Sequence, residues 1–566
     1  MSGVILIQPP VREFYLTRKR TVPYGLASIA ASLHQHGIRA EIIDALARNK
    51  SKPLPFPPEF NHLSPYYGRS DISLFSLFHQ FRHFGYSHGH LASMVRERRP
   101  LVVGISSLFT AYQDQAMATA EAVRQFCPDV YIVMGGHHPT LFPDETLACT
   151  AVDFVLRGEG EVSMSKLCVL LSAYANKREQ GAGRFPPDAD LKKIPGIAFR
   201  QAKGGFVSAP SWTADLDHIP PPDMGNVDQA YYARNKKATI TVVASRGCPF
   251  PCTYCSVSAS SSHGRFRQRS VRDVLAEIRA QADQREIGFI DFEDENLTLQ
   301  RDWAMALFSG IREIFRGRPV ELRAMNGLFP PSLDTDLMAA MKAAGFKTLN
   351  LSLGSFSKEQ LTRYRRPDVT RAHDRVLDMA EGLGLETVSY IIGAGPGQTA
   401  AVTLSDLLML ARRRTLAGLS IFYPAPGSAD YEVCKQEGIL PETFSLMRST
   451  ALPLDHATTR LEAVTLLRLS RILNFLKHWI DSYGSLPAPE AFSQEKADQL
   501  SGETDREMIS NTLVRWFLAG GVIRGMDADG NIYPHTTDAN LCRQFVKGVI
   551  GAPLRGVRRP ETVIIE

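Results

Sequence analysis

Short apolar runs alternate with helical stretches in the N-terminal part of this chain, and this alternation constrains the fold more than any other feature. Stretches such as 25–36 and 112–126 have the apolar spacing of helices. A strand–helix–strand alternation places its strands parallel in one sheet, with helices on both faces. It predicts an α/β fold with a doubly wound, Rossmann-like domain. The predicted strands are 4–7, 40–43, 102–106, 130–134 and 154–156.

Serine, leucine and glycine residues follow the third and fourth of these strands. Ser106-Ser107-Leu108 ends one strand, and Gly135-Gly136 ends the next. Ligands of doubly wound sheets lie at the carboxyl ends of the strands, where glycine lets the backbone approach closely. Ser106, Leu108, Gly135 and Gly136 are therefore candidate ligand contacts. Glycine after a strand is also ordinary turn chemistry, so another ligand, or none, stays open.

Three cysteines stand together further along the chain. Cys248, Cys252 and Cys255 have CxxxCxxC spacing directly after the apolar segment 238–243. Iron–sulfur clusters are held by cysteine thiolates, and a cubane with three protein ligands leaves one iron open. The alternative is a structural zinc ion with His263 as fourth ligand. Zinc spacing usually repeats as CxxC pairs, so the triad favours a 4Fe–4S cluster with one iron open to a substrate or cofactor.

This loop resembles that of the radical S-adenosylmethionine (SAM) superfamily, and the resemblance extends from about residue 236 to residue 437. It implies that the open iron chelates the amino and carboxylate groups of SAM. It also implies a partial (β/α)6 barrel of the TIM type. The strands expected after the cysteine loop are 288–296, 321–325, 348–353, 387–392 and 418–422.

The tips of these strands carry candidate SAM contacts. Acids at strand ends of a barrel are typical of site residues, although the same residue types also cap helices. Related enzymes often have Gly-Ile-Glu-Ser at the fourth strand, whereas this chain has Ser352-Leu353-Gly354-Ser355, so only the two serines correspond. The residues assigned to SAM by the resemblance are Tyr254, Asp294, Asn296, Ser352, Ser355, Gly393 and Gly395.

The Ser-x-Leu and Gly-Gly elements, at their separation, resemble the cobalamin-binding domain of the methionine synthase and methylmalonyl mutase type. The Asp-x-His-x-x-Gly motif of that family is missing, because the loop after the first strand reads Gln8-Pro9-Pro10. The resemblance therefore implies cobalamin without a lower histidine ligand from that motif. Cobalamin-dependent radical SAM enzymes commonly lack it. The runs Pro23-Tyr24-Gly25-Leu26-Ala27 and Arg157-Gly158-Glu159-Gly160-Glu161 also resemble segments of that subfamily.

Four parts are expected along the chain. They are a cobalamin-binding domain at 1–202 with an insertion at 48–100, a linker at 203–235, the radical SAM barrel at 236–437, and a small, mostly helical domain at 438–566. The last part has helical spacing at 460–479 and 508–518, followed by a hairpin-like pattern.

Composition excludes several classes of function. The net charge is only +5 over 566 residues, without a basic stripe carrying aromatics, so nucleic acid is not expected as a partner. The five cysteines outside the triad are scattered and form no disulfide framework. Neither a signal peptide nor an apolar run of membrane-spanning length is present, so a cytoplasmic protein without membrane insertion is expected.

The resemblance implies a radical SAM methyltransferase. A 5'-deoxyadenosyl radical would remove a hydrogen from a small-molecule substrate, and methylcobalamin would methylate the unactivated carbon, or a phosphinate centre. No side chain is expected to act as a catalyst beyond these cofactors, and a flavodoxin or ferredoxin would donate the electron. Two alternatives stay open: a cobalamin and radical SAM cyclase or rearrangement enzyme without methyl transfer, and a non-enzymatic cobalamin-binding or redox-sensing module.

Overall fold

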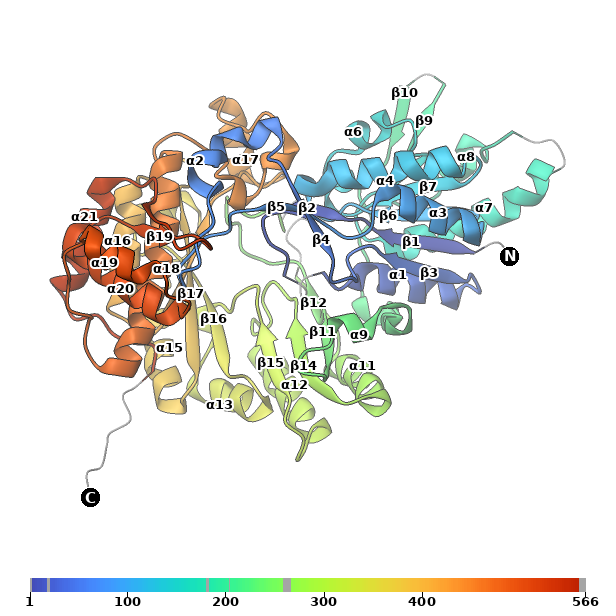
Figure 1. Ribbon diagram of the computed structural model, residues 1–566. Helices are drawn as coiled ribbons and strands as arrows, with labels where there is room; N and C mark the ends of the chain where they lie inside the picture. The colour runs from blue at the N-terminus through green and yellow to red at the C-terminus, as the bar shows by residue number, and fades with distance from the viewer. Residues whose placement is uncertain (1–2, 18–20, 180–182, 203, 258–265, 559–566) are drawn as a thin grey trace. The chain divides into compact units, whose positions relative to one another are not determined.

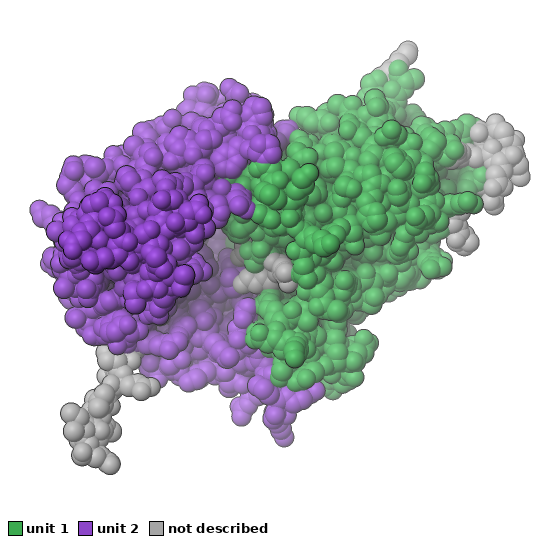
Figure 2. Space-filling model, in the orientation of Figure 1, with its two compact units in different colours: residues 1–54, 81–249, 256–291 green, residues 55–80, 250–255, 292–566 purple. Residues whose placement is uncertain are grey.

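The computed structural model describes residues 3–17, 21–179, 183–202, 204–257 and 266–558 (Figure 1). The chain forms two compact units, which Figure 2 colours green and purple. We call them unit 1 and unit 2. Unit 1 consists of residues 1–54, 81–249 and 256–291. Unit 2 consists of residues 55–80, 250–255 and 292–566.

A seven-stranded sheet forms the centre of unit 1, with the order β10-β9-β8-β7-β6-β1-β3. The five strands from β8 to β3 are parallel, and β9 and β10 are antiparallel additions at one edge. The predicted doubly wound α/β fold is confirmed. The strands are β1 (Val4–Gln8), β3 (Ala40–Asp44), β6 (Val102–Ser106), β7 (Tyr131–Gly135), β8 (Phe154–Leu156), β9 (Ile197–Gln201) and β10 (Gly204–Val207).

Helices cover both faces of this sheet, which explains why its parallel strands are continuous apolar runs. Val4 and Leu6 of β1 belong to the core under α1 and α7, whereas Ile5 and Ile7 belong to the core under α3 and α4. Figure 1 shows α1 on one side of the sheet and α3 and α4 on the other. These helices are α1 (Tyr24–Gln35), α3 (His88–Arg98), α4 (Gln113–Phe126) and α7 (Gly160–Glu179).

The segment 48–100 differs from the insertion expected from the sequence. Its last part is α3, whose Leu91 and Val95 are fully buried in the core of unit 1. Its middle part, 55–80, belongs to unit 2. Its remaining strands join a three-stranded antiparallel sheet with the order β2-β5-β4, formed by β2 (Val11–Glu13), β5 (Phe81–Phe84) and β4 (Ser51–Leu54).

In the region expected to form the barrel, six strands alternate with helices, and a short two-stranded ribbon of β12 (Ser245–Arg246) and β13 (Arg267–Gln268) lies between the first two of them in sequence. In unit 1, β11 (Ala238–Val242) pairs with β14 (Ile287–Phe292). In unit 2, β16, β17 and β18 form a parallel sheet. This is the strand–helix order of the expected (β/α)6 barrel. The remaining elements are α11 (Val271–Gln284), α12 (Arg301–Ile314), β15 (Glu321–Ala324), α13 (Thr335–Ala344), β16 (Thr348–Gly354), α14 (Lys358–Arg363), α15 (Thr370–Leu383), β17 (Glu386–Gly393), α16 (Ala400–Ala411), β18 (Leu416–Ile421) and α17 (Ala429–Gln436).

The C-terminal part of unit 2 is mostly helical, as expected. Its longest helix, α18 (Arg460–Tyr483), starts with a capping box between Thr459 and Glu462. One apolar face of α18 packs into a core shared with α16, α20 and α21. Among the described residues, no helix has the length and apolar character needed to cross a membrane. The other elements are α19 (Gln494–Leu500), α20 (Arg506–Gly520), β19 (Arg524–Met526), β20 (Ile532–Pro534) and α21 (Ala539–Ile550).

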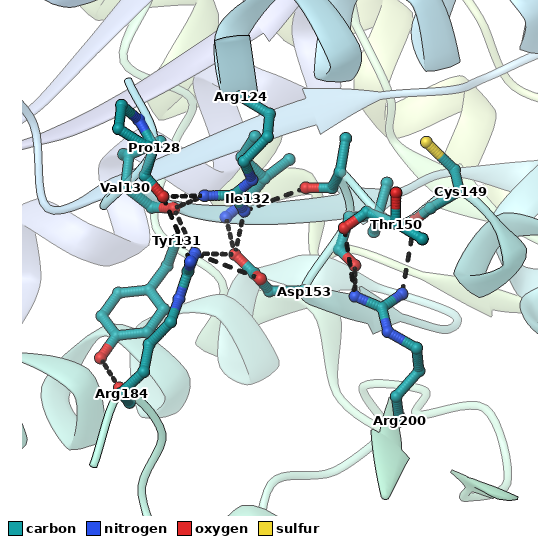
Figure 3. A network of polar contacts seen from close by, with 12 residues as sticks. Arg124, Pro128, Val130, Tyr131, Ile132, Cys149, Thr150, Asp153, Arg184 and Arg200 are labelled. Atoms are coloured by element: carbon teal, nitrogen blue, oxygen red, sulfur yellow. Dashed lines mark hydrogen bonds and ion pairs between the residues drawn. The ribbon is translucent and has the colours of Figure 1, made fainter. Parts of the chain in front are cut away.

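A buried carboxylate organises the loop before β8 (Figure 3). Asp153, whose side chain is 4% exposed, accepts hydrogen bonds from Arg124 Nη2 at 2.6 Å and Arg184 Nη2 at 3.2 Å. It also accepts the backbone N–H of Ile132 at 2.9 Å. The same two guanidinium groups donate to the carbonyl of Val130. Asp153 therefore joins β7, α4 and the segment that contains Arg184.

We expect Asp153→Asn to lower the free energy of unfolding by about 2 kcal/mol, because it leaves two arginines without their shared charge. The shift is measured as a change in the urea midpoint by circular dichroism. Asp190→Asn is the control, since Asp190 and its partner Lys193 are exposed and such pairs contribute about 0.5 kcal/mol or less. Equal shifts in the two variants would contradict the role of Asp153.

Candidate cofactor-binding site

In unit 1, the candidate cobalamin residues meet where β6 and β7 end. Ser106 lies opposite Gly135 in the parallel register. Ser107 N–H donates to the Gly135 carbonyl at 2.8 Å, and His138 N–H donates to the Ser107 carbonyl at 3.2 Å. Gly136 has φ +113°, and a Cβ there would lie 2.6 Å from the Ser107 carbonyl oxygen. Only glycine therefore fits between the two loops without strain.

The surface at this edge fits a cobalamin. The Ser107 hydroxyl is buried and has no hydrogen-bond partner in the part of the chain that the structure describes. Beside it, Leu108 and Phe109 are 49% and 56% exposed. Cobalamin has both amide groups and a broad corrin ring. The Ser107 hydroxyl could bond to such an amide, and Leu108 and Phe109 could pack against such a ring. Buried polar atoms otherwise nearly always have partners.

Histidines 137 and 138 follow the glycine pair, but His138 turns into the protein. His138 is fully buried and packs against Phe142 with ring centroids 5.2 Å apart. Burial lowers the pKa of His138 to about 4 and also lowers the pKa of His137. Both rings are thus kept neutral near pH 7. The Gln8 side chain, at the end of β1 and just before the loop where a lower-ligand motif would begin, donates instead to the Thr21 carbonyl and to Asp44 Oδ1.

In unit 2, the residues around Cys252 are attached to two helices. Cys255 N–H donates to the Cys252 carbonyl at 3.1 Å, which turns the chain between the two thiols. Thr253 N–H donates to the carbonyl of Tyr364, after α14. The Thr253 hydroxyl donates to Asp430 Oδ2 at 3.0 Å, and Asp430 N–H returns a bond to the Thr253 carbonyl at 2.9 Å. The start of α17 therefore holds this short turn.

A buried arginine lies beside Cys252. Arg366 Nη1 lies 3.8 Å from the Cys252 sulfur and 3.0 Å from the Tyr254 hydroxyl. Its Nη2 donates to Ser352 Oγ at 2.6 Å. Burial alone would lower the pKa of Arg366, but Tyr254 and Cys252 outweigh burial and raise it. The guanidinium stays charged and lies beside the sulfur that is assigned to the cluster.

The donor set fits an iron–sulfur cluster. The triad supplies three cysteine side chains, the ligand type that holds iron–sulfur clusters. Cys248 belongs to unit 1, and Cys252 and Cys255 belong to unit 2. Among the described residues, no three His, Cys, Asp or Glu side chains are grouped to hold a metal ion. His263, the fourth ligand of the zinc alternative, lies outside the described residues.

Comparison with known proteins finds a family match for each of two parts of the chain. A model of the radical SAM superfamily matches residues 242–406, and a model of the B12 binding domain matches residues 83–167. Cytidylyl-2-hydroxyethylphosphonate methyltransferase of Streptomyces wedmorensis is 25% identical over 473 residues, covering 79% of this chain and 84% of that protein. The chain thus combines a B12-binding domain with a radical SAM domain.

Two further proteins resemble this radical SAM enzyme. Anaerobic magnesium-protoporphyrin IX monomethyl ester cyclase of Rubrivivax gelatinosus is 26% identical over 347 residues, covering 59% of each chain. The radical SAM methyltransferase TsrM of Kitasatospora setae, solved with cobalamin and a 4Fe–4S cluster bound, has 17% identity and a TM-score of 0.53. That likeness covers 77% of this chain and 75% of TsrM, and it concerns the fold.

The two family matches agree with the expected cofactors SAM and cobalamin, and the 4Fe–4S cluster stays assigned through the cysteine triad. The residues assigned to them remain predictions. Of the SAM candidates, Tyr254 and Ser352 come together through Arg366. Asp294 and Asn296, after β14, are both buried. Sequence analysis missed Arg366. The sequence signal that could have indicated this contact is Gly354, which stands where related enzymes have an acid. Gly354 has φ +91°, and a Cβ there would lie 2.9 Å from Arg366 Cδ, so the arginine occupies the space of a larger side chain.

Three other SAM candidates have strong structural roles. The fully buried Ser355 hydroxyl donates to Asp406 Oδ2 at 2.6 Å and accepts from Ser357 N–H at 3.0 Å. A Cβ on Gly393 would lie 2.7 Å from the Thr403 side chain, and one on Gly395 would lie 2.1 Å from the Tyr364 hydroxyl. These contacts give the serine and the glycines a packing role, and their assignment to SAM stays a prediction.

We expect Gly136→Ala to weaken cobalamin binding about tenfold. The alanine would add about 1–3 kcal/mol of backbone strain and displace the Ser107 carbonyl. Cobalamin retained after reconstitution and desalting is measured by its absorbance. Gly89→Ala, in helix α3 with nothing within 4 Å of the added Cβ, is the control and should retain cobalamin like the unmodified enzyme. Equal retention by the two variants would show that Gly136 does not shape the site.

Proposed function

We propose that this enzyme transfers a methyl group from SAM, by way of cobalamin, to an unactivated carbon or a phosphinate phosphorus of a small molecule. The observation that carries this proposal is the presence of B12-binding and radical SAM matches in one chain. A relative that is 25% identical over 79% of the chain and is named a methyltransferase supports it. When bound, the cluster and SAM supply radical chemistry, and cobalamin supplies a methyl carrier.

The side chains of the enzyme act on these cofactors by position and charge. Cys252 and Cys255 are assigned to the cluster together with Cys248, and Arg366 keeps a positive charge beside the Cys252 sulfur. The end of β6 and the Gly135-Gly136 turn present backbone to cobalamin. None of these groups has to act as a nucleophile or base on the substrate. Their task is to hold the cofactors, and the reacting bonds belong to the cofactors.

A second candidate reaction is cyclisation or rearrangement without methyl transfer. The likeness to the Rubrivivax gelatinosus cyclase favours it, although that likeness covers less of this chain than the methyltransferase does. The two reactions consume SAM differently. A methyl group that leaves SAM produces S-adenosylhomocysteine, whereas radical cleavage alone produces 5'-deoxyadenosine and methionine.

The proposed electron donor is a flavodoxin or a ferredoxin. The cysteines outside the triad are scattered along the chain, without the close spacing of a second cluster. They are Cys127, Cys149, Cys168, Cys434 and Cys542. The reducing electron therefore has to come from a separate redox protein. A cytoplasmic location agrees with this requirement and remains a prediction.

The enzyme reconstituted without oxygen with iron, sulfide and hydroxocobalamin, then given dithionite and SAM, should produce S-adenosylhomocysteine only when cobalamin is present. We expect 5'-deoxyadenosine as the second product. Both products are quantified by liquid chromatography. Deoxyadenosine without any S-adenosylhomocysteine would overturn methyl transfer and favour the cyclase-like reaction.

Cys252→Ala should lower 5'-deoxyadenosine formation to the background, because two thiolates do not hold a site-differentiated cubane. Cys127→Ala is the matched control: it removes a free, partly exposed thiol after helix α4, outside the triad. That variant should keep the rate of the unmodified enzyme. Equal loss in the two variants would contradict the assignment of Cys252 to the cluster.

A further inference from the structure

The run Arg157-Gly158-Glu159-Gly160-Glu161 forms the turn between β8 and α7 in unit 1. Gly158 has φ +86°, and a Cβ there would lie 2.2 Å from the Ser211 carbonyl oxygen. Glu159 N–H donates to that same carbonyl at 2.8 Å. The turn is therefore packed tightly against the chain near Ser211. This close approach fixes the backbone from which the Glu159 side chain extends.

A two-stranded ribbon lies at the ends of the segment that carries the cysteine triad. Strand β12 (Ser245–Arg246) ends just before Cys248, and β13 (Arg267–Gln268) follows the triad. The two strands pair antiparallel, with Arg246 opposite Arg267. We call the stretch between the two strands, which carries the three cysteines, the cysteine segment. The ribbon joins its two ends. Both strands belong to unit 1.

Two arginines directly opposite each other would repel, because like charges across a ribbon destabilise it. Glu159 removes this repulsion. Its Oε1 lies 3.3 Å from Arg246 Nη1 and 2.8 Å from Arg267 Nη2, and its Oε2 accepts from Arg267 Nη1 at 3.0 Å. The three side chains are only 10%, 20% and 9% exposed. At this burial, ion pairs with two-pronged geometry are strong and specific in direction.

A second carboxylate of the same turn fixes Arg246 from its other side. Glu161 Oε1 accepts from Arg246 Nη2 at 2.7 Å and from the Ser28 hydroxyl at 2.9 Å. Ser28 lies on α1, and Tyr24 at the start of α1 lines a small cavity with Arg246. The Pro-Tyr-Gly run and the Arg-Gly-Glu-Gly-Glu run therefore meet at one arginine, next to the cysteine segment.

Glu159 is ionised in this network. Burial alone would raise its pKa, but the hydrogen bonds from Arg267 and the charge of Arg246 outweigh burial, and the pKa lies below its usual value. Thr213 N–H also donates to Oε2 at 2.7 Å. Glu159 thus remains a carboxylate at neutral pH, and each of its oxygens holds an arginine.

We propose that Glu159 is a positioning residue for the iron–sulfur cluster, which clamps Arg246 and Arg267 and so holds the two ends of the cysteine segment together. Glu159 follows strand β8 of the sheet that is assigned to cobalamin, and Arg246 lies two residues before Cys248. The sheet thereby fixes the position at which the loop with Cys248 begins. The proposal rests on the assignment of the three cysteines to a 4Fe–4S cluster and is independent of methyl transfer.

The test is the rate at which a chelator removes iron from the anaerobically reconstituted enzyme. Glu159→Gln keeps the size of the side chain but loses its charge, and we expect iron release about tenfold faster, the scale of losing an outer partner of a metal site. Glu159→Asp, which keeps the charge with shorter reach, should give an intermediate rate. The electron paramagnetic resonance spectrum of the dithionite-reduced cluster should change in Glu159→Gln.

Asp153→Asn is the matched control. Asp153 is also a buried carboxylate in unit 1 held by two arginines, Arg124 and Arg184, but it lies in the loop before β8 (Figure 3). We expect this variant to lose stability while it keeps the iron-release rate and the spectrum of the unmodified enzyme. Iron release from Glu159→Gln no faster than from Asp153→Asn would overturn the proposal.

If Glu159→Gln does not fold, Arg267→Lys replaces it in the same comparison. Lysine keeps the positive charge but loses the two-pronged contact with Glu159. Faster iron release than in Asp153→Asn supports the clamp, and an equal rate overturns it. Because methyl transfer is not measured, a failure of the proposed reaction does not alter the result. Loss of all bound iron in Cys252→Ala separately tests the cluster assignment.

Discussion

Parallel strand pairing is the constraint on which the rest of this structure depends. Parallel strands cannot be joined by tight turns, so each strand continues into a crossover, usually a helix. The carboxyl ends of neighbouring strands then meet at one edge. The strands of unit 1 are buried on both faces, so polar contacts gather where they end. The register that sets Ser106 opposite Gly135 makes the Ser107 and Gly136 loops neighbours.

Much of this fold could be predicted from local pattern. The strands at 102–106 and 154–156 have the predicted limits, because a short apolar run defines a buried strand without reference to the rest of the chain. Helix α3 was missed because its sequence contains few apolar residues. Its Leu91 and Val95 are buried by tertiary packing, which local periodicity does not report.

The site could be predicted only in part, for a similar reason. The cysteine spacing and the Gly135-Gly136 pair are local signals, and they indicated the cofactors correctly. Arg366 and Glu159 act through contacts with residues far away in the sequence, such as Cys252 and Arg267. Ser355 makes a contact of the same kind, because its hydroxyl donates to Asp406. Its assignment to SAM stays a prediction.

The arginines around the cysteine segment differ in what balances their charge. Arg246 and Arg267 are paired with Glu159, and Arg246 also with Glu161. In the part of the chain that the structure describes, the hydrogen bonds of Arg366 go to carbonyl and hydroxyl oxygens and the Cys252 sulfur, with no carboxylate among them.

A buried cation without a carboxylate is costly unless another negative group lies near it. Thiolates that hold a cluster are such groups. Among the described residues, Arg246 and Arg267 are therefore balanced by carboxylates, whereas Arg366 contacts oxygens of carbonyl and hydroxyl groups and the Cys252 sulfur.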